Sequence, residues 1–276
     1  MDFLLDPLAH AFFRRALLAG VAVGTAGGLL GLFVVQRGLS FLTDGLAHAT
    51  FGGLALGLLL GTSVDQSFAV ALPFVVLVAL GIALVRRRSG LGADVSTGVF
   101  FSMAFALGIV CLGLRPATAP VVDVESLLFG SILAVSQGGL LAILAIAALT
   151  VGTLVALWSR LAYATFDPEL AAISGVRVAL VESTLMVLVA VVVVAGLRSV
   201  GVVLVSAFVI LPAATAHLLA RRLLPIALLS VSLAMGATVV GLLLSYHLNL
   251  ASGATIVVLL GAGFFVALTS GQGRRP

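Results

Sequence analysis

The sequence predicts an all-α membrane protein, a polytopic bundle of about nine transmembrane helices. Of its 276 residues, 62% are hydrophobic and only 9% are charged, and the mean hydropathy is +1.33. A soluble domain carries about 25% charged residues, so this chain cannot cover a water-facing surface. The apolar runs are long and evenly spread, and the alternation typical of a membrane β-barrel is absent. These features indicate one transmembrane domain, 1–276.

Apolar runs of roughly 18 to 24 residues, long enough to cross the hydrocarbon core, define the expected spans. They are 14–36, 45–62, 66–86, 94–114, 137–159, 178–197, 200–220, 223–246 and 251–269. The segment 121–134 is too short to cross, and we interpret it as a re-entrant or interfacial piece. Such a segment is tolerated only where protein covers its backbone.

The arginines indicate the orientation, because basic residues concentrate on the cytoplasmic side of membrane proteins. With the N-terminus outside, the inner side receives Arg37, Arg86, Arg87, Arg88, Arg160, Arg177, Arg221, Arg222, Arg274 and Arg275. The outer side keeps Arg14, Arg15, Arg115 and Arg198. We therefore expect the N-terminus outside and the C-terminus inside, although the two arginines ahead of the first span favour the opposite.

All fourteen basic residues are arginine, and this composition excludes several functions. A phosphate-binding P-loop requires a lysine, and no GxxxxGK[ST] motif occurs, so any ATPase that drives this protein must be another chain. The motifs HExxH and GxSxG are absent, so no hydrolytic enzyme site is visible. The net charge of +4 is spread over segment ends rather than gathered in one patch, which argues against nucleic acid as a partner.

Asp44 and His48 form the candidate metal site. They lie four residues apart, about one helical turn, so both side chains project from one face. Ionisable groups inside a bilayer are costly and usually functional. A carboxylate oxygen with an imidazole nitrogen suits Zn(II), Mn(II) or Fe(II), and suits Cu(I) poorly without sulfur ligands. The alternative is structural: Asp44 caps the helix and His48 bonds to backbone.

Other ionisable residues are weaker candidates. His217 falls near the inner end of its span and could join the site, although a lone membrane histidine more often bonds a backbone carbonyl. His247 lies at the outer end of its span, and Glu182 is expected to pair with Arg177 or Arg86. Two acids that could meet an incoming ion on the outer side are Asp123 and Glu125.

Two stripes of small residues flank the candidate pair. One lies in the first span and comprises Gly20, Gly24 and Gly28; the other follows the pair and comprises Gly53, Gly57 and Gly61. Glycines spaced by four residues let membrane helices approach closely. Because a short loop joins the two spans, we expect the stripes to pack the bundle and to lie against each other.

A short helix outside the bilayer is predicted between the fifth and sixth spans, within residues 165–176. Asp167 can cap this helix, Pro168 suits its first position, Glu169 favours its positive end, and Gly175 stops it.

Leu170 and Ile173 would share one face of this helix, with Ala171 and Ala172 beside them, as a small apolar knob. The knob either inserts into a partner protein or lies on the membrane surface.

Five stretches, in chain order, carry a resemblance to a known family. They are Phe12 to Gly57, ESLLFGSIL (Glu125 to Leu133), FDPELAAISGV (Phe166 to Val176), VGVVLVSAFVILPAATA (Val200 to Ala216) and SYHLNLASGATIVVL (Ser245 to Leu259). Together they resemble the permease subunits of the bacterial zinc/manganese/iron ABC importers, and the match extends over nearly the whole chain.

The resemblance implies the permease fold shared with vitamin B12 and siderophore importers, in a bacterial cytoplasmic membrane. It implies two permease subunits, two ABC ATPase subunits and an extracytoplasmic metal-binding protein. We expect the two permeases to form a homodimer, and a pair of non-identical permeases remains open. The family's metal site maps onto Asp44 and His48, whereas His217 and His247 inherit no role. The stretch that matches its ATPase-coupling helix contains Phe166, Asp167, Pro168, Glu169, Leu170, Ile173 and Gly175.

We therefore expect ATP-driven import of zinc, manganese or iron, and the additional histidines favour zinc slightly. The metal is cargo, no covalent cofactor is expected, and ATP acts only through the partner subunit. Two alternatives remain open. A permease for a siderophore or cobalamin would share the architecture but would need a wide pathway and no paired ligands. An ion-coupled secondary transporter would need neither a coupling helix nor an ATPase.

Overall fold

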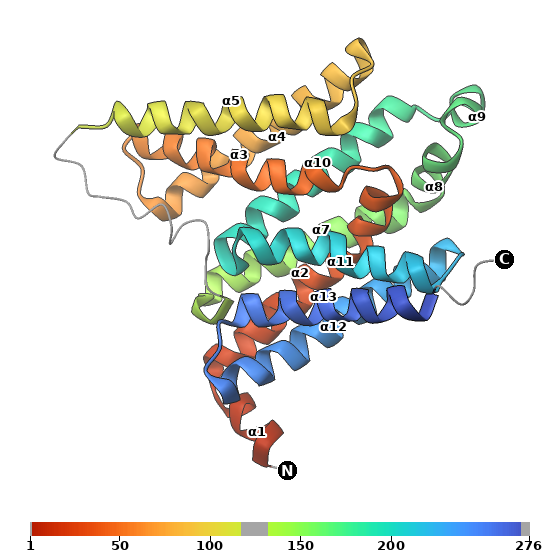
Figure 1. The fold of residues 1–276 in the computed structure, drawn as a ribbon. Coiled ribbons are helices and arrows are strands. Elements are labelled where there is room, and N and C mark those ends of the chain that lie inside the picture. Colours follow the sequence, from red (N-terminus) through yellow and green to blue (C-terminus); the bar gives the residue numbers. More distant parts are fainter. Residues whose placement is uncertain (1, 117–131, 272–276) are drawn as a thin grey trace.

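A computed structural model describes residues 2–116 and 132–271, and all regular structure within these ranges is helical (Figure 1). The long helices are α2 (Ala11–Gln36), α3 (Ser40–Leu59), α4 (Val64–Ser89), α5 (Ala93–Gly113), α7 (Gln137–Ala156), α10 (Val178–Val200), α11 (Val202–Leu219), α12 (Leu223–Leu248) and α13 (Ser252–Gly271). The short elements are α1 (Asp2–Ala9), the 3₁₀ turn η1 (Ile132–Ala134), α8 (Trp158–Phe166) and α9 (Pro168–Ile173). The prediction of an all-helical bundle is confirmed.

Eight helices in the described ranges are long and apolar enough to cross a membrane, and they correspond to eight of the nine expected spans. The remaining expected span, 45–62, is α3, in which Asp44, His48 and the glycines reduce the hydropathy. Its 20 residues still extend about 30 Å, the thickness of the hydrocarbon core. Most of α3 is buried against other helices, so protein rather than lipid surrounds it.

Like α7, the helices α3, α4 and α10 end three residues from the expected bounds, and one expected span is also interrupted. The span 137–159 is shorter, because α7 ends at Ala156 and the chain turns at Leu157 into the separate helix α8. Leu157, with a φ of −97°, is both the C-cap of α7 and the N-cap of α8. The expected re-entrant segment 121–134 lies outside the described residues except for η1, in which Ile132 is buried.

The glycine stripe of α2 faces α12 and α11. A Cβ atom built on Gly20 would lie 2.6 Å from a methyl group of Thr238 on α12. The hydroxyl of Ser230, also on α12, donates a hydrogen bond of 2.7 Å to the carbonyl of Gly28. One turn further, a Cβ on Gly31 would overlap a backbone carbonyl of α11. These glycines therefore let three helix backbones meet at close range.

The glycine stripe of α3 faces α4. Cβ atoms built on Gly53 and Gly57 would lie 2.6 Å from the Cα of Ala71 and 2.8 Å from the Cβ of Ser67. Gly61 does not belong to this contact: no atom of the described residues lies within 4 Å of its built Cβ, and its φ of +83° places it in the turn after α3. The expectation that the two stripes pack against each other is wrong, because α2 packs mainly on α11 and α12 and α3 on α4 and α5.

One end of the bundle gathers α8, α9, the turn between α4 and α5, and the C-terminal end of α13, on the right of Figure 1. We call it the α9 end. The turns between α3 and α4 and between α12 and α13 lie at the opposite end. At the α9 end, Arg86 donates a hydrogen bond of 2.6 Å to Glu182 and ties α4 to α10. This confirms Arg86 as a partner of Glu182.

Substitution of Gly31 tests the close approach of α2 and α11. Gly31→Ala places a methyl group against a backbone carbonyl that cannot move aside. We therefore expect the free energy of unfolding to fall by roughly 1–3 kcal/mol and the melting temperature in detergent to be lower. Gly152→Ala on α7 is the matched control, because its built Cβ has no neighbour within 4 Å and alanine favours a helix. Equal melting temperatures for the two variants would contradict the observed packing.

Candidate functional site

Asp44 and His48 lie inside α3 rather than at its start. The helix begins at Ser40, and its N-cap is Leu39, which makes no side-chain capping bond. With a rise of 1.5 Å per residue, the two side chains lie about 6 and 12 Å along the helix from its first residue. The structural alternative is therefore wrong for Asp44, which does not cap the helix, and correct for His48, whose ring bonds a backbone carbonyl. The pair lies in the half of α3 nearer the α9 end.

The two side chains are arranged so that one imidazole nitrogen is available. Nδ1 of His48 lies 3.0 Å from the backbone carbonyl oxygen of Asp44 and 3.7 Å from the carboxylate oxygen Oδ2. A carbonyl can only accept, so Nδ1 donates its proton, and the neutral ring then carries its lone pair on Nε2. A bond from the second ring nitrogen to a carbonyl is the usual way a metal-binding histidine is oriented.

The pair faces outward from an otherwise buried helix segment. The Asp44 side chain is 46% exposed and the His48 side chain is 33% exposed, whereas Gly45, Leu46 and Ala47 between them are buried. The His48 ring meets the ring of Phe101 on α5 edge to face, with centroids 5.3 Å apart. A carboxylate and an imidazole therefore lie on the surface of this subunit, along the seam between α3 and α5.

Within the described residues, no more than two candidate metal ligands lie together at this place. Across residues 2–116 and 132–271, no three His, Cys, Asp or Glu side chains gather in one place. His217 does not join the pair: it forms a backbone hydrogen bond with Leu32 of α2, and its Nε2 is buried without a partner. His247 lies in the last turn of α12, at the opposite end. The acids Asp123 and Glu125 lie outside the described residues.

Phe101 is a residue of this site that sequence reasoning missed. It belongs to an aromatic series in which Phe105, four residues later on α5, contacts Phe51 of α3 with centroids 5.0 Å apart. The spacing of four between the two α5 rings is visible in the sequence. Their pairing with α3 is not, because it depends on how α5 lies beside that helix.

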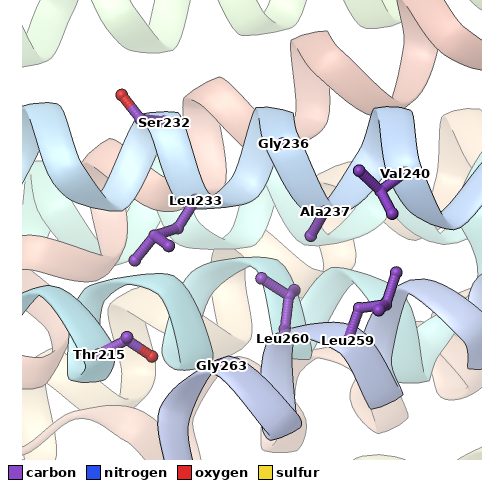
Figure 2. A pocket seen from close by; sticks show the side chains of 9 residues that line it. All are labelled: Thr215, Ser232, Leu233, Gly236, Ala237, Val240, Leu259, Leu260 and Gly263. Atoms are coloured by element: carbon purple, nitrogen blue, oxygen red, sulfur yellow. The ribbon is translucent and has the colours of Figure 1, made fainter. Parts of the chain in front are cut away.

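A separate apolar cavity of about 260 Å³ lies between α11, α12 and α13 (Figure 2). Thr215 and Ser232 are its only residues with polar side chains, and Figure 2 shows the Ser232 hydroxyl directed away from it; the other lining residues are aliphatic or glycine. It contains no carboxylate, imidazole or thiol, so it offers no strong ligand to a transition metal.

The short helix predicted within 165–176 is α9, and its ends form as expected. Oδ1 of Asp167 accepts a hydrogen bond of 2.8 Å from the backbone amide of Leu170, and Pro168 occupies the first position. Glu169 lies in the first turn. Gly175, with a φ of +84°, follows the helix and reverses the chain toward α10.

The apolar residues around α9 point away from the bundle. Ile173 is 84% exposed, and Phe166 and Leu170 are also exposed. Ala171 instead is fully buried and holds α9 against the rest of the chain. The knob therefore consists of Leu170 and Ile173, as expected, together with the exposed Ala172 and with Phe166 of the expected coupling stretch. The expectation that Ala171 lies beside the knob is wrong.

Comparisons with known proteins agree with this arrangement. The model of the ABC 3 transport family matches residues 9–271. The manganese transport system membrane protein MntC of Listeria innocua is 34% identical over 267 residues, which cover 97% of this chain and 93% of that protein. The manganese import system permease protein ScaB of Streptococcus parasanguinis is 36% identical over 255 residues, covering 92% of this chain and 89% of that protein.

The solved structure of PsaBC from Streptococcus pneumoniae in complex with Fab contains a similar chain. It superposes with a TM-score of 0.81 at 32% identity and covers 96% of this chain and 94% of that one. The family match, the identity and the shared fold each extend over nearly the whole described bundle. This multi-pass membrane protein therefore belongs to the ABC 3 transport family.

Proposed function

We propose that this chain is the permease subunit of an ATP-driven importer of a divalent transition metal ion, and that Asp44 and His48 bind the ion in transit. One observation carries the proposal: the two ionisable side chains are partly exposed on a helix that is otherwise nearly all buried. Facing lipid, a carboxylate and an imidazole would be costly. If they face a second subunit or an aqueous pathway instead, the two side chains can act as metal ligands.

The second subunit in this proposal is another copy of the same chain. One copy supplies two protein ligands, and a two-fold axis beside α3 and α5 would bring together two carboxylates and two imidazoles. An open site with few ligands also suits an ion that must leave again.

Manganese is the metal that we propose. Oxygen and nitrogen donors accept Mn(II), Zn(II) and Fe(II), and the absence of a thiolate disfavours Cu(I). The sequence alone favoured zinc slightly because of its additional histidines. The relatives MntC and ScaB are described as manganese transport proteins, and this outweighs histidines that take no part in the pair.

ATP hydrolysis is assigned to two copies of a separate ABC ATPase, and ion delivery to an extracytoplasmic metal-binding protein. The chain has no lysine and hence no P-loop. The knob on α9 presents apolar surface outside the bundle, where a protein partner would cover it. Phe166, Leu170 and Ile173 supply the contact, and the carboxylate of Asp167 and the turn at Gly175 hold the helix in shape.

The bacterial cytoplasmic membrane is the proposed location, with the α9 end inside and the N-terminus outside. Arg37, Arg86, Arg160 and Arg177 all lie at the α9 end, as the positive-inside rule requires of a cytoplasmic face. In the resulting cycle, the ion enters from the binding protein, pauses at the pair, and leaves inward when the ATPases move α9.

Removal of either ligand tests the proposed metal site. With the ATPase and the binding protein in proteoliposomes, Asp44→Asn and His48→Gln should each reduce manganese uptake at least about tenfold, because each replaces one of few strong ligands by a weakly binding neutral amide. Uptake is measured by metal analysis of the recovered vesicles.

A matched control exists in the same chain. Asp6 and His10 have the same spacing, and the His10 ring bonds the Asp6 carbonyl at 3.1 Å, but this pair is exposed and lies before the first span. Asp6→Asn and His10→Gln should leave uptake unchanged. Full uptake by the Asp44 and His48 variants would refute the site.

Competition decides the identity of the metal. Vesicles with the complete transporter and equal concentrations of manganese, zinc and iron(II) should accumulate mostly manganese, in an amount that depends on ATP. Zinc as the main accumulated ion would restore the preference drawn from the sequence. Accumulation without ATP would instead favour an ion-coupled secondary transporter.

Ile173→Asp tests the docking of the ATPase. A charge on the most exposed part of the knob should abolish copurification of the ATPase and ATP-driven uptake, because the apolar contact would have to bury a carboxylate. Leu60→Asp is the control, since Leu60 is 67% exposed at the opposite end of the bundle. Copurification of the ATPase with the Ile173 variant would argue against the proposed interface.

A further inference from the structure

The turn between α2 and α3 is short and firmly held. Only Arg37, Gly38 and Leu39 separate the two helices. Leu39 is buried, and its amide donates a hydrogen bond of 2.8 Å to the carbonyl of Val34 in α2. A turn of this length transmits displacement, because the start of α3 cannot move without moving the end of α2. Asp44 follows five residues after Leu39.

Arg37 connects this turn to α8. Its Nε donates to the hydroxyl of Thr165 at 2.9 Å, and its terminal nitrogen donates to the carbonyl of Leu161 at 3.4 Å. The Thr165 hydroxyl in turn donates to the same carbonyl, so the three groups form a closed cluster. Thr165 is two residues before Asp167, the cap of α9.

The guanidinium of Arg37 lies among other charged groups at the α9 end. Burial lowers the pKa of Arg37, the charge of Glu182 raises it, and the charge of Arg86 lowers it. An arginine remains protonated in such surroundings. The negative charge of Glu182 thus stabilises two guanidinium groups, that of Arg37 just after α2 and that of Arg86 in α4. Glu182 itself belongs to α10, the helix that follows α9.

The hydrogen bonds of this cluster hold the turn at residues 37–39 in a fixed position relative to α8. A partly buried guanidinium that leaves its acceptors becomes unpaired in a poorly solvated position, so the cluster resists relative movement of the elements that it joins. The cluster joins the base of α9 to the helix that carries Asp44, although α9 itself packs on α8 and α10 rather than on α3.

We propose that Arg37 is a positioning residue that passes the displacement of α9 to Asp44 and His48, through Thr165 and the turn at residues 37–39. This inference rests on the proposed function. It adds that movement of α9 reaches the metal pair along a polar connection. The competing route runs through α10, which contacts both α9 and α3.

Thr165→Val and Thr165→Ser test the connection in the complete transporter with its ATPase and binding protein. Valine keeps the shape of threonine but cannot accept from Arg37, whereas serine can. The measured quantity is the number of metal ions taken up per ATP hydrolysed. We expect this ratio to fall about fivefold or more for Thr165→Val and for Arg37→Gln, with assembly and ATP hydrolysis retained, and to stay near wild type for Thr165→Ser.

Thr153→Val is the control, because the Thr153 hydroxyl also donates to the carbonyl four residues earlier but accepts no bond from an arginine. If Arg37→Gln does not assemble, Thr165→Val decides, since it leaves every charge in place. An assembled Thr165→Val complex with a wild-type ratio overturns the inference and favours the route through α10. A Thr165→Val complex that fails to assemble also overturns it, because the role of the hydroxyl is then structural.

The two proposals fail in different ways. If the wild-type complex moves no metal, the proposed function is wrong. If the wild-type complex moves metal and the Thr165 variants do not differ from it in the ratio, only the role of Arg37 is wrong. Manganese binding by the isolated permease should be equal in wild type and Thr165→Val, because neither ligand is altered.

Discussion

The intolerance of a bilayer for exposed ionisable groups is the constraint on which this structure depends. Asp44 and His48 lie on a helix that must lie within the membrane, and one chain leaves both partly uncovered. Hydrocarbon cannot solvate them, so the exposed seam between α3 and α5 requires either a protein neighbour or water. Under the proposed function, a second copy of the chain covers this seam and completes the metal site.

The packing around α3 follows from the same constraint. A helix with a carboxylate, an imidazole and many glycines gains little from contact with lipid. It is held instead by close contact with α4, which Gly53 and Gly57 permit because they have no side chain, and with α5, where Gly52 meets the backbone of Ala104. The stripe on α2 does the same toward α11 and α12. The backbone of α3 is therefore held in close contact with the backbones of its neighbouring helices.

Much of the fold could be read from the chain because its signals are local. Apolar length predicts the crossings, and capping chemistry predicts α9 from Asp167, Pro168 and Gly175. The sequence did not predict which helices pack against each other. The two glycine stripes were expected to face each other because they are neighbours in sequence, yet each faces helices that come later in the chain. A stripe specifies close contact and carries no information about its partner.

The sequence by itself determined the kind of protein, the places of its helices, and the pairing of a carboxylate with an imidazole one turn apart. These depend on composition and on the geometry of a single helix. The tertiary structure decided that Asp44 is no cap, that His217 stays apart, and that Arg37 reaches Thr165 across 128 positions of sequence. Such contacts depend on the relative placement of whole helices, which the summed packing of many side chains sets and no local pattern encodes.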